Sequence, residues 1–427
     1  MSRRSFLHLP HALIGAAAFA AAFGPALVSA SEPQLSAVSG QMEERHAGLV
    51  SEGTAKKINQ LQELATAEKY DEVIAGFKAL LPKVAGNDYE TALVLQNLGN
   101  AHFGKGGSTD YRAAIGYFEQ TLAFKALPIP TENSMVYTIA QLHMQLEAYA
   151  KTVTLLGPWF KATTNPRPES FVLMANALGL QGKWREALPW VQKAIAATDR
   201  PQESWYALQL YAQYELKDYK ACAETLEVLV SLWPDNKKYW DQLAGMYIET
   251  KEDTKALAVM GLARRKGYMA EERNIVNLAQ MYFLNDAPFE GAQLLDQAIA
   301  AKQVVPTLKT YQILAEAWIA AREWSKATET LGRGCEVAPD GEMCVRKAQI
   351  HVDRLEYAAA VKAIERAFQK GTLRRPGYAY MIAGRAAAET RSFKEAEAAF
   401  MKARGFEDTR NSANTWLDYV RELQAAR

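Results

Sequence analysis

A regular hydrophobic pattern marks residues 237–267. Its first half places apolar residues at positions i, i+3, i+4 and i+7, which predicts one face of a helix: Trp240, Leu243, Ala244 and Tyr247. After the polar turn ETKED, smaller residues follow at the spacing of a second helix: Ala256, Met260 and Ala263. Large residues on the first helix and small residues on the second favour close antiparallel packing of the two.

The small residue that opens the second helix recurs along the chain at intervals of 33 to 41 residues. It stands at Val73, Ala114, Thr152, Ala187, Cys222, Ala256, Gly291, Ala327, Ala360 and Ala396. Such a period predicts an all-α solenoid of about ten helix-turn-helix repeats. The first two intervals are the longest, and FGKGGSTDY, ending at Tyr111, is interpreted as an inserted loop.

The pattern W-x2-L-[GA]-x2-Y, followed by A-x3-large-x2-A, resembles the tetratricopeptide repeat (TPR). One TPR hairpin cannot bury its own apolar face, so neighbouring copies must stack on it. The last segment has apolar residues at helical spacing: Trp416, Tyr419, Val420 and Leu423. We therefore expect a capping helix over residues 410–427.

The repeats differ in regularity along the chain. Residues 56–165 are expected to form irregular N-terminal TPR units, and Pro158 is expected to bend or end the second helix of the third unit. The segment TTNPRP around Pro166 is the clearest internal break. Residues 166–409 are expected to form regular units.

The N-terminus has the features of an export signal over residues 1–30. Arg3 and Arg4 precede an apolar stretch, and small residues before and at Ala30 suit cleavage near that position. The opening S-R-R-S-F-L resembles the twin-arginine signal, with an ordinary Sec signal as the alternative. Residues 31–55 are polar and are expected to be a linker. We expect a periplasmic mature chain that does not span a membrane, because no other apolar run is long enough.

Catalytic motifs are absent from the sequence. It lacks H-E-x-x-H, G-x-S-x-G and the phosphate-loop spacing, so we predict no enzyme, no cofactor and no small-molecule substrate. The formal net charge of +1 gives no indication of nucleic-acid binding. His102, His143 and His351 occupy the position that holds Tyr247 in another repeat, so they are predicted to pack locally rather than to bind a metal.

The chain has three cysteines, Cys222, Cys335 and Cys344. Cys222 stands at the small, buried position of its repeat and is expected to be a free thiol. Cys335 and Cys344 flank the turn between two repeats, so they can form a disulfide in an oxidising compartment or remain reduced. Their Cα separation decides between the two.

One position of each first helix is expected to line the inner wall of the solenoid. In order it holds Gln62, Asn100, Gln141, Asn176, Tyr211, Gly245, Gln280, Glu316, Gln349 and Arg385. Carboxamides both donate and accept hydrogen bonds, which suits the backbone of a bound peptide. We therefore expect a protein-binding groove along this row.

Aromatic residues are concentrated between Trp159 and Trp240. Trp190, Trp205 and Trp233 do not fit the core positions of the repeat. This stretch predicts either an exposed protein-contact patch or a tightly packed pair of repeats, and both interpretations remain open.

Several segments resemble exported bacterial TPR proteins that accompany TonB energy-transducing systems. They are LGPWF at 156–160, YELKDY at 214–219, WPDNKKYWDQLA at 233–244, NLAQMY at 277–282 and APF at 287–289. The resemblance implies a non-enzymatic periplasmic scaffold that is accessory to TonB, ExbB and ExbD in iron-siderophore uptake. The alternative is an assembly scaffold for envelope polysaccharide secretion or outer-membrane protein biogenesis.

Overall fold

The computed structural model describes residues 47–425 of the chain. The predicted signal peptide, residues 1–30, and the first part of the predicted linker therefore lie outside the described residues. The first helix begins at Glu52, so the last residues that the sequence assigned to the linker are helical. None of the described helices is both long enough and apolar enough to cross a bilayer.

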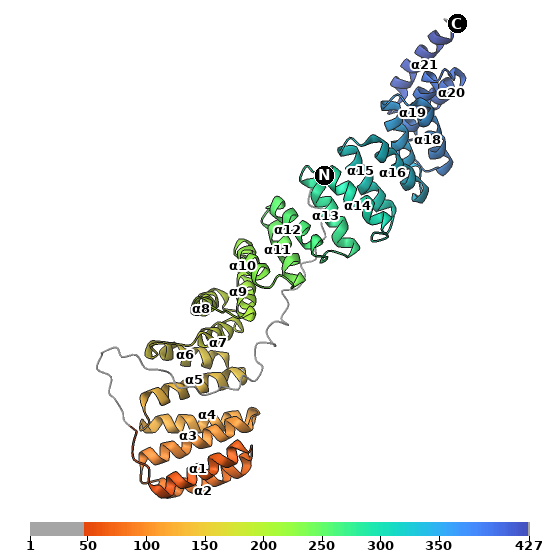
Figure 1. The fold of residues 1–427 in the computed structure, drawn as a ribbon. Helices are drawn as coiled ribbons and strands as arrows, with labels where there is room; N and C mark the ends of the chain where they lie inside the picture. The colour runs from red at the N-terminus through yellow and green to blue at the C-terminus, as the bar shows by residue number, and fades with distance from the viewer. Residues whose placement is uncertain (1–46, 426–427) are drawn as a thin grey trace. The chain divides into compact units, whose positions relative to one another are not determined.

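The described residues form 21 α-helices, packed pairwise in sequential hairpins (Figure 1). They divide into two compact units, one ending at Pro234 and the other beginning at Asp235. Each unit is a TPR-like stack of helix-turn-helix pairs, which confirms the predicted all-α repeat fold. The predicted change in repeat regularity at residue 166 is a different kind of boundary and stays a prediction.

The unit that ends at Pro234 contains five hairpins. They are α1 (Glu52–Thr66) with α2 (Tyr70–Val84), α3 (Asp88–Lys105) with α4 (Ser108–Phe124), α5 (Ile129–Gln145) with α6 (Tyr149–Ala162), α7 (Pro168–Gly179) with α8 (Trp184–Ala196), and α9 (Glu203–Glu215) with α10 (Tyr219–Leu232).

The unit that begins at Asp235 contains five further hairpins and a last helix. They are α11 (Lys237–Glu249) with α12 (Asp253–Arg265), α13 (Glu272–Leu284) with α14 (Pro288–Ala300), α15 (Leu308–Ala320) with α16 (Trp324–Val337), α17 (Glu342–Asp353) with α18 (Tyr357–Lys370), α19 (Pro376–Glu389) with α20 (Phe393–Arg404), and α21 (Arg410–Ala425).

The small residue of each second helix is buried in all ten hairpins, as the repeat pattern predicted. In several hairpins this residue faces a backbone carbonyl of the first helix, twelve positions earlier. The Thr152 hydroxyl donates to the Ala140 carbonyl at 3.1 Å. A Cβ built at Gly291 would lie 2.5 Å from the Ala279 carbonyl oxygen. The residue must therefore be small because the two helix backbones nearly touch there.

The turn within each hairpin contains a residue of positive φ, between +57° and +78°, and the turn of the second hairpin contains a further one, Gly107, at +89°. In hairpin order, the ten residues in that range are Glu68, Gly106, Glu147, Gly182, Lys217, Lys251, Asp286, Arg322, Leu355 and Arg391. In every hairpin but the second, this conformation closes the first helix, because the next backbone N–H donates back to a carbonyl of its last turn. In the ninth hairpin, for example, the Glu356 N–H donates to the His351 carbonyl at 2.8 Å.

Two local features differ from the simplest reading of the sequence. Of the two effects expected of Pro158, an end to the helix is excluded, because α6 continues to Ala162. The helix is held there because the Trp159 Nε1–H donates to the Asn133 carbonyl at 2.9 Å and the Trp159 ring stacks on Tyr137. The segment FGKGGSTDY is not a loop, because α3 runs to Lys105 and α4 begins at Ser108.

The predicted capping helix is present as α21. It packs on α20 and buries Ala413, Leu417 and Val420. The Trp416 ring stacks on Phe400, with 5.6 Å between the ring centroids. This helix covers the apolar face that the tenth hairpin would otherwise leave exposed, which is the role of a terminal cap.

We predict that Leu355→Gly raises the free energy of unfolding by about 0.5–1 kcal/mol. Leu355 is 66% exposed and has φ +61°, so the substitution removes backbone strain without removing core contacts. The left-handed region costs a non-glycine residue about 1–2 kcal/mol, and the greater chain entropy of glycine offsets part of that gain. Urea unfolding followed by far-ultraviolet circular dichroism measures the change.

The matched control is Ala398→Gly, at an exposed position inside α20. It should lower the free energy of unfolding by up to about 1 kcal/mol, because glycine disfavours a helix interior. Equal destabilisation by both substitutions would contradict the role of the left-handed turn.

Candidate functional site

The first helices of successive hairpins lie close to one another within each unit. Contacts join α1 to α3, α7 to α9, α13 to α15 and α17 to α19. No comparable contact joins the second helices of successive hairpins among the described residues. The helices on the inner side of a curved stack are the closer ones, so the first helices form the inner surface of each unit.

In the unit that ends at Pro234, the predicted row holds Gln62, Asn100, Gln141, Asn176 and Tyr211. The amides of Asn100 and Gln141 lie at the surface and have no hydrogen-bond partner among the described residues. The Gln62 amide donates to Asn97 at 3.2 Å. Asn176 is only 5% exposed, so it contributes little to a binding surface. The Tyr211 ring packs edge-on against Trp184.

In the unit that begins at Asp235, the row holds Gly245, Gln280, Glu316, Gln349 and Arg385. Gln280 is partly exposed and has no hydrogen-bond partner among the described residues. Glu316 accepts from Arg346 of the next hairpin at 3.1 Å. Gln349 donates to Asp353 at 2.6 Å and accepts from the Tyr378 hydroxyl at 2.7 Å. The row therefore contains two kinds of amide: those already hydrogen-bonded within the protein, and those available to a partner.

Two exposed phenylalanines extend this surface, and the sequence analysis missed them. Phe103 is 43% exposed and Phe283 is 40% exposed. Each follows an available amide, Asn100 or Gln280, by three residues, so each lies one turn further along the same helix face. Counting three residues on from the predicted row would have found both. An apolar ring beside a free amide is typical of a protein-contact surface.

The aromatic residues of the third and fourth hairpins form a packed stack. Phe160 lies at its centre, with 5.1 Å to Trp159, 5.1 Å to Phe171 and 4.6 Å to Trp190 between ring centroids. Burial raises the pKa of Tyr137, beside Trp159, to about 12. These contacts favour the tightly packed interpretation of the aromatic stretch.

The sequence predicted that all three histidines pack locally, and two of them make polar contacts to a nearby carboxylate. The Nδ1 of His102 lies 2.6 Å from Asp110, and the Nδ1 of His351 lies 2.7 Å from Glu356. Burial, reinforced by nearby Lys151, lowers the pKa of His143. No group of His, Cys, Asp and Glu side chains suited to a metal ion occurs in the part of the chain that the structure describes.

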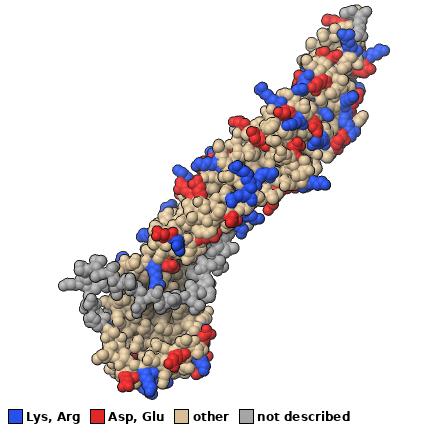
Figure 2. Space-filling model, in the orientation of Figure 1, with Lys and Arg blue, Asp and Glu red and all other residues tan. Residues whose placement is uncertain are grey.

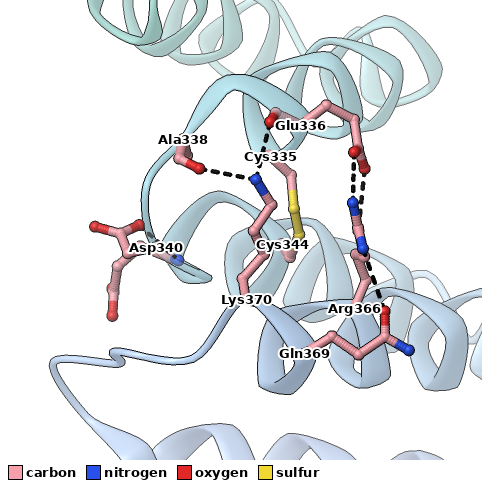
Figure 3. The surroundings of a disulfide bond; sticks show 9 residues. Cys335, Glu336, Ala338, Asp340, Cys344, Arg366, Gln369 and Lys370 are labelled. Carbon is pink, nitrogen blue, oxygen red and sulfur yellow. Dashed lines mark hydrogen bonds and ion pairs between the residues drawn. A yellow bond between two sulfur atoms is a disulfide. The ribbon is translucent and has the colours of Figure 1, made fainter.

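The structure joins Cys335 of α16 to Cys344 of α17 in a disulfide, with 5.3 Å between their Cα atoms (Figure 3). This separation is ordinary for a disulfide. The adjoining end of α16 is held further by Lys370, whose ammonium donates to the Glu336 and Ala338 carbonyls, both at 2.8 Å. Cys222 is free and buried, and burial raises its pKa to about 12.

Charges of both signs are mixed on the face of residues 235–425 that Figure 2 shows. In the other unit, the area over α3 and α4 that Figure 2 shows carries few charged side chains. A mixed surface does not steer a polyanion such as nucleic acid, and an uncharged area suits contact with another protein.

Neither a family model nor a curated protein sequence matches this chain. Three solved structures with some similarity each have low sequence identity to this chain. They include a MamA double mutant (RS-1 ArsTM), 16% identical over 43% of this chain and 97% of its own, with TM-score 0.37. A TPR protein from Parabacteroides merdae is 14% identical over 60% of this chain and 98% of its own, with TM-score 0.30.

A third similar structure is YrrB, described as a TPR protein with an unusual peptide-binding site. It is 14% identical over 43% of this chain and 89% of its own, with TM-score 0.35. The assignment of the TPR-like fold here rests on the hairpins themselves: the buried small residues, the left-handed turns and the contacts between first helices.

We predict that the native chain does not react with Ellman's reagent at pH 8. The attacking species is the thiolate, and Cys222 is buried with its pKa raised to about 12, so it stays protonated and covered. In denaturant without reductant one thiol per chain should react. After reduction of the disulfide all three cysteines should react.

The control is Cys222→Ser, which should give no reactive thiol in denaturant until reductant is added. Three reactive thiols in unreduced, denatured wild-type protein from an oxidising compartment would contradict the disulfide. Rapid reaction of the native chain would contradict the burial of Cys222.

Proposed function

We propose that this protein is a non-enzymatic periplasmic scaffold that binds a partner protein on the inner surface of its hairpins. The observation that carries the proposal is the pairing of available amides with exposed phenylalanines on the first helices. Asn100 with Phe103 and Gln280 with Phe283 recur at the same place in different hairpins. Amides that both donate and accept suit a polypeptide backbone, and the rings provide apolar anchors.

Binding there requires no chemistry from the scaffold. A partner segment would lie along the first helices, with its backbone hydrogen-bonded to the free amides and its apolar side chains against the phenylalanines. Within the unit that ends at Pro234, the available amides of Asn100 and Gln141 lie on successive hairpins, so one segment is held at two points. Such an arrangement fixes the position of the partner, and any chemical activity belongs to the partner rather than to the scaffold.

The more specific proposal is that the partner belongs to a TonB, ExbB and ExbD system that drives uptake of iron-siderophores. It is supported by the resemblance of segments such as 233–244 and 277–282 to TPR proteins that accompany these systems. The disulfide between Cys335 and Cys344 supports an oxidising compartment, which agrees with export through the predicted signal peptide.

The test is affinity capture from envelope extracts with the mature chain, residues 31–427, as bait. The proposal predicts recovery of TonB, ExbB or ExbD. Replacing both anchors, Phe103→Ala with Phe283→Ala, should lower that recovery at least tenfold, because interface aromatics commonly contribute about 1–2 kcal/mol or more each.

The matched control is Leu232→Ala with Leu262→Ala. These side chains are 53% and 44% exposed and lie on the second helices α10 and α12. This variant should capture as the wild type does. Recovery of polysaccharide-secretion or outer-membrane assembly proteins in place of the TonB system would favour the alternative scaffold. An equal loss in both double variants would contradict the inner surface as the binding site.

A further inference from the structure

A second, charged pocket lies on a different surface from the row of amides. It has a volume of about 310 Å³ and is formed where α16, α17 and α18 meet. Cys335 and Cys344, joined by the disulfide, form part of its wall. Lys347 of α17 lines it, whereas Gln349 of the amide row is two residues further on. A separation of two residues turns a helix by about 200°, so the two side chains point to opposite faces of α17.

Positive charge dominates the lining of this pocket. Lys347, Lys362, Arg366 and Glu336 all line it. Arg366 is neutralised by Glu336, to which its Nε donates at 3.2 Å and its terminal nitrogen at 2.6 Å (Figure 3). The ammonium groups of Lys347 and Lys362 have no hydrogen bond or ion pair with any described residue. The charge of Lys347 also acts on the Glu336 carboxylate and helps to lower its pKa. Three cationic side chains against this one carboxylate leave the lining with an excess of positive charge.

The position of Lys347 is built into the surrounding helices. Lys347 follows Cys344 by three residues, so the disulfide fixes the turn of α17 that carries it. Across the pocket, α16 has a glycine, Gly332, and a Cβ built there would lie 3.0 Å from the Lys347 Nζ. The Lys347 ammonium therefore lies against α16 at Gly332, although the end of a lysine side chain can shift to admit a small residue there.

The remaining titratable group of the lining does not cancel this charge. His351 lies on the same face of α17, one turn beyond Lys347, and its Nδ1 is engaged by Glu356 at 2.7 Å. Glu356 is also paired with Arg354 at 2.9 Å, so its carboxylate is already shared between two partners. No further carboxylate lines the pocket among the described residues.

We propose that this pocket binds a phosphate dianion, either free or carried as a small monoester. Two ammonium groups match a double negative charge, and lysine is a common phosphate ligand. The volume is far larger than one phosphate group needs, so it admits a short substituent beside it. This site is independent of the proposed protein-binding surface, because it lies on the opposite side of α17.

The experiment is isothermal titration calorimetry of the mature chain, residues 31–427, with inorganic phosphate and separately with glycerol 3-phosphate. Sodium chloride at the same ionic strength provides the blank, because it reproduces non-specific screening. The proposal predicts a saturable heat with at least one of the two ligands. Tighter binding of glycerol 3-phosphate would indicate that the ligand is a monoester, and equal or tighter binding of inorganic phosphate would indicate the free ion.

The double variant Lys347→Met with Lys362→Met should weaken binding at least tenfold. Methionine keeps much of the apolar stem of lysine and removes only the charge. The matched control, Lys309→Met with Lys394→Met, removes two exposed lysines of the same unit that lie outside the pocket, and it should bind as the wild type does.

Lys362→Met alone provides a second test at an exposed position, where loss of folding is not expected. It should also weaken binding measurably. The proposal is overturned if neither ligand gives a saturable heat above the chloride blank. It is equally overturned if the pocket variants bind as tightly as the wild type, or if the control variant loses binding to the same extent.

Discussion

The close approach of two helix backbones within each hairpin is the constraint on which the rest of this structure depends. It occurs where the small residue of the second helix faces a carbonyl of the first, as at Thr152 and Ala140. Close approach allows large side chains from either side of the contact to interlock, and it leaves no room for a larger residue at that point. The residue of positive φ in each turn then ends the first helix, so that the chain can reverse and pack the second helix against it.

This constraint also determines which surfaces are free for function. The core positions of every hairpin are occupied by packing, so a partner or ligand can use only the faces that packing leaves. One is the inner face of the first helices, with available amides and the rings of Phe103 and Phe283. Another is the junction of α16, α17 and α18, where the side chains of Lys347, Lys362 and Arg366 outnumber the single carboxylate of Glu336.

Much of the fold could be predicted from the sequence because the determining contact is local. The small residue that opens each second helix, such as Ala256 or Ala327, recurs at intervals of 33 to 41 residues and so identifies every hairpin. Both helices of a hairpin are neighbours in the chain. The sequence could not decide whether Pro158 ends its helix, because only the local effect of proline is visible there. The contacts that keep α6 helical, from Trp159 to Asn133 and Tyr137, come from another helix and have no signature in the sequence.

The candidate surfaces were harder to predict than the fold. The inner row could be placed by register, yet register does not show that Asn176 is covered or that Gln349 is already hydrogen-bonded. The charged pocket could not be predicted at all, because Lys347, Lys362 and Gly332 belong to three helices. Lys347 and Lys362 belong to one hairpin, but Gly332 and the disulfide partner Cys335 come from the preceding hairpin, so the complete lining forms only when the two hairpins stack.

The most direct test of the backbone contact is to add one methyl group at it. Gly291→Ala places a Cβ against the Ala279 carbonyl oxygen, whereas Gly245→Ala, in the middle of α11, meets no atom within 4 Å. Alanine favours a helix over glycine by about 1 kcal/mol, so both substitutions would otherwise stabilise the protein. The account predicts that Gly245→Ala raises the free energy of unfolding, and that Gly291→Ala lowers it by about 1–2 kcal/mol through overpacking. Equal stabilisation by both, measured by urea unfolding, would contradict the account.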